Sequence, residues 1–338
     1  MGFRFFKRIK LMPGVTMNLS KSAPSFSFGP RGMKYTVGAS GTRTTLGIPG
    51  TGLYYTKLNS RKKKNQDQAP PPPQSLAEAG FFRQLFSSPE EKSLLQGMRK
   101  FLEGNQAEAY QVLQQNANSV DSQFMCGFIA LGQKKYEQAE RHFRFCQQRL
   151  GELGQTIKKL GGDFEMLLEV TEFIEAPVLA DQRGLTLAMV EAYQHQDKYQ
   201  LALQTLTEIW NSNPSDKVIL LSLTDLVANS LSCTNEELKE IAELTSDVEN
   251  QEPIDANILY LRAYVLYRLG LKDAAIKLMG AVARKKKDRP RELLLCAKYM
   301  RGQMYEEIGE TKKANKDYQE VYAEDPQFED VAAKLGLS

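Results

Sequence analysis

Residues 302–326 read GQMYEEIGETKKANKDYQEVYAEDP, and this stretch decides how the larger part of the chain is organised. Apolar and small residues recur in it at helical spacing on both sides of Gly309, and Pro326 stands at its end. This pattern predicts two helices joined by a tight turn. Paired segments of the same kind recur upstream from about residue 89, so we expect helix pairs to fill the chain from there to its end.

These pairs resemble the tetratricopeptide repeat, a helix-turn-helix unit of about 34 residues. The family's small, aromatic, turn and helix-ending positions carry Gly302, Tyr305, Gly309, Ala314, Tyr318 and Pro326 in the last copy. Earlier copies carry Gly127, Tyr136, Ala139 and Phe143; Tyr193, Tyr199, Ala202 and Pro214; Ala263, Gly270 and Ala275; and, more loosely, Gly97, Gly104 and Ala109.

The spacing of the marker alanines at 109, 139, 202, 275 and 314 leaves two wide gaps, each with room for a further degenerate pair. We therefore expect an all-α solenoid of about seven helix pairs over residues 75–338. The least regular section is 151–181, where either a distorted pair or a protruding insertion is expected. Stacked pairs of this kind form a curved array with a concave side.

The N-terminal residues follow a different period. In FGPRGMKYTVGASGTRTTLGIPG (28–50), glycines recur every nine residues, and apolar residues alternate with polar ones between them. Period two predicts short strands, and glycine suits the turns that join them. We expect a small all-β N-terminal domain, an antiparallel meander of hairpins. A calcium-binding nonapeptide roll would need Asp in the turns, and a phosphate loop would need Gly-Lys-Ser/Thr opening a helix; neither is present.

The opening MGFRF and the segment TTLGIPGTGLYYT (44–56) resemble a bacterial N-terminal domain known as domain-of-unknown-function family 4236. The resemblance covers about residues 1–58 and implies a bacterial, cytoplasmic setting but no activity. RKKKNQDQAPPPP (61–73) follows. Its basic run and four prolines predict an extended linker over residues 59–74.

Charge divides the chain in the same place. Thirteen Lys and Arg precede residue 66 without one Asp or Glu, whereas the remaining residues hold 31 bases and 41 acids. The basic module could therefore attract a polyanion, either nucleic acid or an anionic membrane surface. The candidate polyanion-binding residues are Arg4, Lys7, Arg8, Lys10, Arg31, Lys34, Arg43, Arg61, Lys62, Lys63 and Lys64.

Signs of catalysis, cofactors and metals are missing from the sequence. The four cysteines are dispersed, and neither His142 nor His195 has a Ser, Cys or carboxylate at a recognisable motif spacing. No apolar run reaches the roughly 18 residues that span a bilayer, and charge interrupts the N-terminal apolar residues throughout. We expect a cytoplasmic, non-enzymatic protein without a cofactor. The basic cluster RKKKDRPR (284–291) is either a grip for an anionic partner or a solvated loop between repeats.

Two stripes of residues mark the helix that begins near Pro253. Leu259, Ala263 and Leu266 form the apolar stripe that a helix pair buries, while Tyr260, Tyr264 and Tyr267 form a second stripe about 100° away. In the tetratricopeptide family the first helix of each pair lines the concave side, so the tyrosines either bind a partner or complete the packing. Further candidates are Phe124, Phe128 and Tyr299.

Three functions fit these observations. The first is an adaptor that captures a protein or peptide on its helical repeats while the basic module fixes it to a second component. The second is a polyanion-binding protein that acts through its N-terminal domain. The third is self-assembly, in which the basic module docks on the acidic repeats. The adaptor hypothesis predicts that replacing the three stripe tyrosines by alanine weakens partner capture without unfolding the helices.

Overall fold

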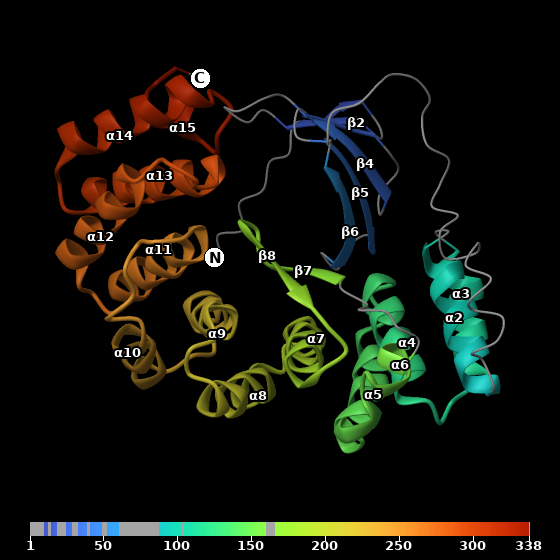
Figure 1. The fold of residues 1–338 in the computed structure, drawn as a ribbon. Coiled ribbons are helices and arrows are strands. Elements are labelled where there is room, and N and C mark those ends of the chain that lie inside the picture. Colours follow the sequence, from blue (N-terminus) through green and yellow to red (C-terminus); the bar gives the residue numbers. More distant parts are fainter. Residues whose placement is uncertain are drawn as a thin grey trace. The chain divides into compact units, whose positions relative to one another are not determined.

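The structure, a computed structural model, describes residues 10–12, 15–18, 25–28, 33–38, 41–48, 53–60, 88–102, 105–159 and 166–337 (Figure 1). The chain divides into two compact units. One comprises residues 8–168 and 177–196, and the other comprises residues 1–7, 169–176 and 197–338. Each unit contains helices that pack in pairs, as the helical spacing of the sequence predicts.

The first unit begins with six short strands in which each strand pairs antiparallel with the next. The longest ladder joins β5 to β6 and places Leu46 opposite Tyr55. Residues 1–9, where the expected N-terminal domain begins, lie outside the described residues. The strands are β1 (Lys10–Met12), β2 (Val15–Asn18), β3 (Ser25–Phe28), β4 (Met33–Gly38), β5 (Gly41–Ile48) and β6 (Leu53–Ser60).

The expected fold class, a small all-β N-terminal domain followed by an all-α array, is wrong. Two strands, β7 (Met166–Thr171) and β8 (Ile174–Val178), interrupt the helices, and the sheet continues from β6 into them through the pairing of Tyr54 with Leu167. An independent all-β domain is therefore not established, and the helical region is not all-α. The sequence MLLEVTEFIEAPV (166–178) forms strands because β-branched and aromatic residues fit a pleated ribbon.

A glycine lets two helices of the first unit approach each other closely. Gly127 on α4 (Val120–Gly132) lies so close to Phe143 that an added Cβ would stand 2.3 Å from the ring atom Cε1. This approach encloses the edge-to-face cluster of Phe124, Phe128 and Phe143. The helices are α2 (Pro89–Leu102), α3 (Gln106–Gln114), α4 (Val120–Gly132), α5 (Tyr136–Gln148), α6 (Gln155–Lys159) and α7 (Gln182–Gln194), with a 3₁₀ turn at Leu150–Glu152.

The second unit contains a similar contact between a glycine and an aromatic ring near its end, where Gly302 makes room for the ring of Tyr318. Tyr299, Tyr318 and Val331 belong to one buried cluster there. Gly270 and Gly309 end the first helices of two pairs with φ near +80°, a backbone region that favours glycine. The helices are α8 (Tyr199–Ser212), α9 (Lys217–Asn229), α10 (Asn235–Leu244), α11 (Pro253–Arg268), α12 (Lys272–Arg284), α13 (Arg291–Glu307), α14 (Thr311–Glu324) and α15 (Val331–Lys334).

Polar side chains fix where several helices begin. Asp216 accepts hydrogen bonds from the backbone N–H groups of the first turn of α9, and Thr234 forms a capping box with Glu237 at the start of α10. Asp121 on α4 accepts from the backbone N–H groups of Gly154 at 2.5 Å and Ile157 at 3.0 Å, at the start of α6. These bonds satisfy donors that a helix cannot satisfy by itself.

Residues 151–181, the section expected to be irregular, hold the end of the 3₁₀ turn, α6, β7 and β8. Residues 169–176, which include the turn between the two strands, belong to the second unit. The insertion therefore supplies that unit with a short β segment. Within the described part of the chain, no helix combines the length and apolarity needed to cross a membrane.

Candidate functional site

The apolar stripe of α11 lies in the core of the second unit. Leu259, Ala263 and Leu266 are all buried. The tyrosine stripe divides in two, because Tyr260 is buried whereas Tyr264 and Tyr267 are half-buried. The helix thus completes its packing without the last two rings, which leaves part of their surface open to contact.

Tyr264 and Tyr267 are held in a defined arrangement. Their rings stack with centroids 6.3 Å apart and planes 17° from parallel. The Tyr267 hydroxyl donates a hydrogen bond to the Glu307 carboxylate on α13, which also pairs with the Lys272 ammonium at 2.9 Å. Burial, followed by this hydrogen bond to Glu307, raises the pKa of Tyr267 to about 12, so the phenol is neutral at physiological pH.

Tyr260 occupies a different position one helical turn earlier. Its hydroxyl contacts the Met300 sulfur on α13 at 2.9 Å, and its ring meets the ring of Phe173 edge-on at a centroid distance of 6.0 Å. Phe173 stands in the turn between β7 and β8. Tyr260 is therefore covered by a segment from far along the chain, and burial raises its pKa well above the usual value.

The same turn makes a polar contact with α11. The Thr171 hydroxyl donates to the side-chain oxygen of Asn257 at 2.6 Å and accepts from the backbone N–H of Phe173 at 3.3 Å. Asn257 is 1% exposed. Its side-chain nitrogen has no hydrogen-bond acceptor among the residues that the structure describes. A buried amide with one end satisfied and the other open is costly in free energy.

The other aromatic candidates lie in the cores. Phe124 and Phe128 are completely buried on α4. Tyr299 is buried on α13, and its hydroxyl donates to the Asp330 carboxylate. The structure therefore places Tyr264 and Tyr267 at an accessible surface, and it places the three other rings where they stabilise packing.

The candidate polyanion-binding residues stay predictions. Lys10, Lys34 and Arg43 lie in β1, β4 and β5, whose backbone alone is described. The remaining candidates lie outside the described residues: Arg4, Lys7, Arg8, Arg31, Arg61, Lys62, Lys63 and Lys64.

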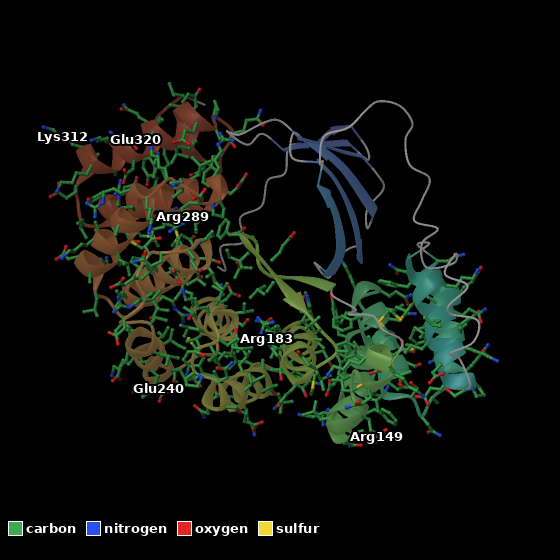
Figure 2. All side chains as sticks on the ribbon, in the orientation of Figure 1. Arg149, Arg183, Glu240, Arg289, Lys312 and Glu320 are labelled. Atoms are coloured by element: carbon green, nitrogen blue, oxygen red, sulfur yellow. The ribbon has the colours of Figure 1, made fainter. Side chains whose placement is uncertain are left out.

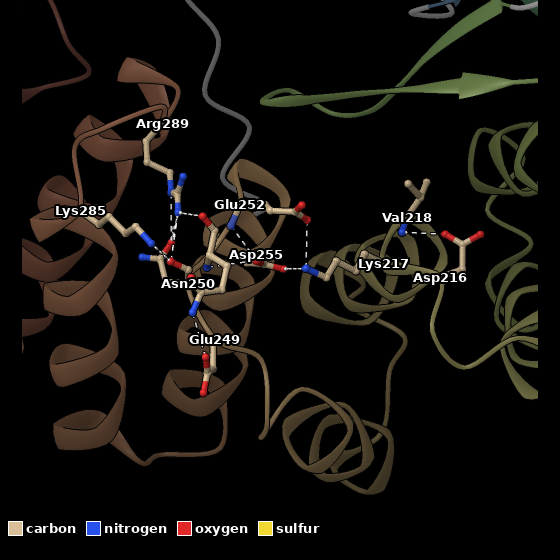
Figure 3. Close-up of polar contacts among 10 residues, drawn as sticks. Asp216, Lys217, Val218, Glu249, Asn250, Glu252, Asp255, Lys285 and Arg289 are labelled. Carbon is tan, nitrogen blue, oxygen red and sulfur yellow. Dashed lines mark hydrogen bonds and ion pairs between the residues drawn. The ribbon is translucent and has the colours of Figure 1, made fainter.

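The second basic cluster, residues 284–291, joins two helix pairs (Figure 3). Lys285 and Arg289 both donate to the loop before α11: Arg289 reaches the side-chain oxygen of Asn250 at 2.8 Å and the carbonyl of Gln251 at 2.9 Å. On the other side of α11, Lys217 pairs with Asp255 at 2.8 Å. These bases brace the start of α11. Other charges project outward, such as the exposed Lys312 and Glu240 (Figure 2).

Both histidines are held by neighbouring side chains. His142 hydrogen-bonds to the hydroxyl of Tyr110 at 2.8 Å and to the side-chain oxygen of Gln123 at 2.5 Å. His195 stacks on Tyr136 with ring centroids 4.3 Å apart and contacts the Glu191 carboxylate at 3.0 Å, one helical turn earlier on α7. Within the described ranges, no group of three or more His, Cys, Asp or Glu side chains could hold a metal ion.

Sequence reasoning missed the turn of the β7–β8 insertion and its contact with Asn257. The available signal was an amide in an otherwise apolar helix segment, ANILYL (256–261), together with the alternation of residues 166–178. Neither pattern shows that the two segments meet, because 86 residues separate Thr171 from Asn257.

A family model described as a protein of unknown function (DUF4236) matches residues 3–56. This match confirms the resemblance drawn from the N-terminal sequence, and it covers a small part of the chain. No curated protein matches the chain.

Several solved structures are similar over the helical region. The N-terminal domain of the EccA1 ATPase from the ESX-1 secretion system of Mycobacterium tuberculosis is 12% identical, with a TM-score of 0.50, over 73% of this chain and 88% of that one. At this identity the similarity concerns the fold. The quorum sensor NprR from B. thuringiensis is 15% identical, with a TM-score of 0.47, over 76% of this chain and 71% of that one. A tetratricopeptide repeat protein from Parabacteroides merdae is 14% identical, with a TM-score of 0.34, over 74% of this chain and 98% of that one.

Proposed function

We propose that this protein is a non-enzymatic scaffold that binds a polypeptide partner through the α11 face carrying Tyr264 and Tyr267. The observation that supports it most is that the two rings are stacked on each other and only half-buried, while the Tyr267 hydroxyl is held by a hydrogen bond to Glu307 on α13. Rigid tyrosines provide a large contact area and a polar hydroxyl at a low entropic cost.

The surroundings of the two rings favour a polypeptide over a small molecule. Glu307 and Lys272 form a charged border beside Tyr267, so that an apolar contact area is edged by groups that bind backbone or charged side chains. Charged groups beside an aromatic contact area are typical of protein interfaces, where a polar rim borders an apolar centre. Because the hydroxyl of Tyr267 is already fixed, little side-chain freedom is lost when a partner binds.

The N-terminal basic module would fix this scaffold to a second component. Its support is the sequence alone, which places thirteen bases and no acid before residue 66. A field of one sign promotes association with an acidic partner and makes that association sensitive to salt.

The experiment is quantitative affinity capture with the full-length chain. We compare wild type with a variant carrying Tyr264→Ser and Tyr267→Ser, and with Tyr305→Ser. Tyr305 is also half-buried and packs against the core cluster that contains Tyr318, so this control measures the effect of losing tyrosine packing away from α11. Partners that depend on the proposed surface are depleted about tenfold or more by the double substitution, as expected of a hot spot. Equal recovery from all three proteins, each with wild-type circular dichroism, would refute the proposal.

A further inference from the structure

The turn between β7 and β8 has features of a bound ligand. It reaches α11 with one polar and one aromatic contact: Thr171 on Asn257, and Phe173 on Tyr260. Glu172 lies between these two residues. Burial and then Cys296 raise the pKa of Tyr260, with a further contribution from the charge of Glu172, and burial followed by Glu172 raises the pKa of Cys296. The turn therefore lies against α11.

The turn does not satisfy all the hydrogen-bonding groups of the surface that it covers. Asn257 can accept hydrogen bonds at its oxygen and donate two from its nitrogen, but within the described chain only the oxygen is used. An extended peptide has a backbone carbonyl at each residue and could satisfy that nitrogen while its side chain fills the place of Phe173. The β7–β8 turn, by contrast, leaves the Asn257 side-chain nitrogen without an acceptor among the described residues.

The surface formed by Asn257 and Tyr260 is continuous with the proposed partner-binding face at Tyr264. Tyr260 and Tyr264 are one helical turn apart on α11, so their side chains neighbour each other on the same side of the helix. A peptide that enters beside Tyr264 and runs toward the start of α11 meets Tyr260 and then Asn257. On this path the β7–β8 turn is an obstacle.

We propose that Asn257 and Tyr260 form a subsite for an extended polypeptide segment bearing an aromatic side chain, and that the turn at residues 171–173 is an internal mimic which the segment displaces. This inference rests on the proposed function, because it extends the same binding face by one helical turn. It gives the partner a chemistry: an aromatic ring against Tyr260 and a backbone carbonyl for the Asn257 amide.

Competition between the internal turn and a free peptide should weaken peptide binding by a measurable factor. A tethered segment acts at an effective concentration in the millimolar range, so a free peptide with a Kd of about 0.1 mM for the open subsite binds the wild-type chain about tenfold more weakly. Removing the contacts of the turn should restore the stronger binding.

The test uses the turn itself as the probe. A fluorescent peptide of residues 166–178, closed by a disulfide between added terminal cysteines, is titrated by anisotropy against full-length wild type and against full-length Thr171→Ala/Phe173→Ala. We expect the variant to bind about tenfold more tightly. Adding Tyr260→Leu to that variant should abolish the gain, and a peptide with alanine in place of its phenylalanine should not bind either protein.

Equal binding of the peptide to wild type and variant, or no binding to either, would overturn the inference. If the variant does not fold, hydrogen exchange on wild type decides: saturating peptide should accelerate exchange at residues 171–174, and unchanged exchange rejects displacement. The proposed function is tested separately by Tyr264 and Tyr267. Loss of partner capture in their double variant, with no peptide binding here, would leave the scaffold standing and remove the subsite.

Discussion

His142 joins three helices of the first unit through side-chain hydrogen bonds. Its two ring nitrogens meet Tyr110 on α3 and Gln123 on α4, while Gln138 on α5 donates to the same Tyr110 hydroxyl. Burial, followed by the charge of Arg141, lowers the pKa of His142 to about 4. The network therefore requires a neutral imidazole.

The low pKa of His142 predicts acid sensitivity. The unfolded chain takes up a proton near the ordinary pKa of about 6.5, whereas the folded chain resists protonation down to about 4. Stability is therefore complete above pH 6.5 and falls as the pH drops toward 4. After allowance for partial solvent screening we expect a loss of about 2 kcal/mol.

Urea unfolding of wild type and His142→Gln at intervals between pH 7 and pH 4 measures this loss. Glutamine retains hydrogen-bonding groups but does not titrate, so the difference between the two proteins should change across that window. A constant difference would show that His142 is not held neutral.

The tyrosine stripe shows how far single residues could be predicted. Helical spacing correctly separates the core stripe of Leu259, Ala263 and Leu266 from the tyrosines. It cannot show that Tyr260 is covered, because the cover is Phe173 from a distant segment. The triple alanine variant suggested by the sequence is therefore a poor test, since truncating the buried Tyr260 also destabilises the core.

At the scale of helices, the small residues of each pair set how closely the two helices approach. An added methyl at Gly127 would overlap the ring of Phe143, whereas an added methyl at Gly151 would meet nothing within 4 Å. Gly127→Ala should destabilise the first unit by about 1–3 kcal/mol through overpacking. Gly151→Ala is the matched control and should leave the thermal midpoint nearly unchanged. Equal midpoints for the two variants would contradict the packing described for α4 and α5.

Arg268 at the end of α11 secures the end of α9. Its guanidinium donates to the carbonyls of Val227, Ala228 and Ser230 at 2.9 to 3.1 Å. Because charge-assisted hydrogen bonds to otherwise unpaired helix ends are strong, Arg268→Ala should cost about 1–3 kcal/mol. Arg262→Ala, which removes a single bond to the carbonyl of Ala242 at 3.2 Å, should cost less in the same urea titration. The reverse order would contradict this assignment.

The β7–β8 insertion marks the limit of prediction for whole segments. Helices depend on neighbours three and four residues away, so their pairing could be predicted from local spacing. Strands pair with segments that can be distant in the sequence, and the local pattern of residues does not identify those segments. The sequence predicts an irregular section over residues 151–181, but the strand pairing within it and the contact with Asn257 come from long-range packing.

Across the whole molecule, charge and secondary structure change together along the sequence. The residues before position 66 carry thirteen bases and no acid, and the rest of the chain holds more acids than bases. Binding of the full-length chain to a DNA duplex should then weaken steeply between 50 and 200 mM salt, because neutralised phosphates release counterions. Salt-independent binding, or none at low salt, would remove the polyanion hypothesis and leave the scaffold to stand on its helical repeats.

The central claim is that a polypeptide partner contacts α11 at Tyr264. The most direct measurement replaces Tyr264 of the full-length chain by the photo-crosslinker p-benzoylphenylalanine in the cells that make this protein, with the same group at the exposed Lys312 of α14 as control. We predict a crosslinked polypeptide from position 264 that position 312 does not give and that Tyr267→Ser diminishes. No adduct from position 264, or the same adducts from both positions, would contradict the claim.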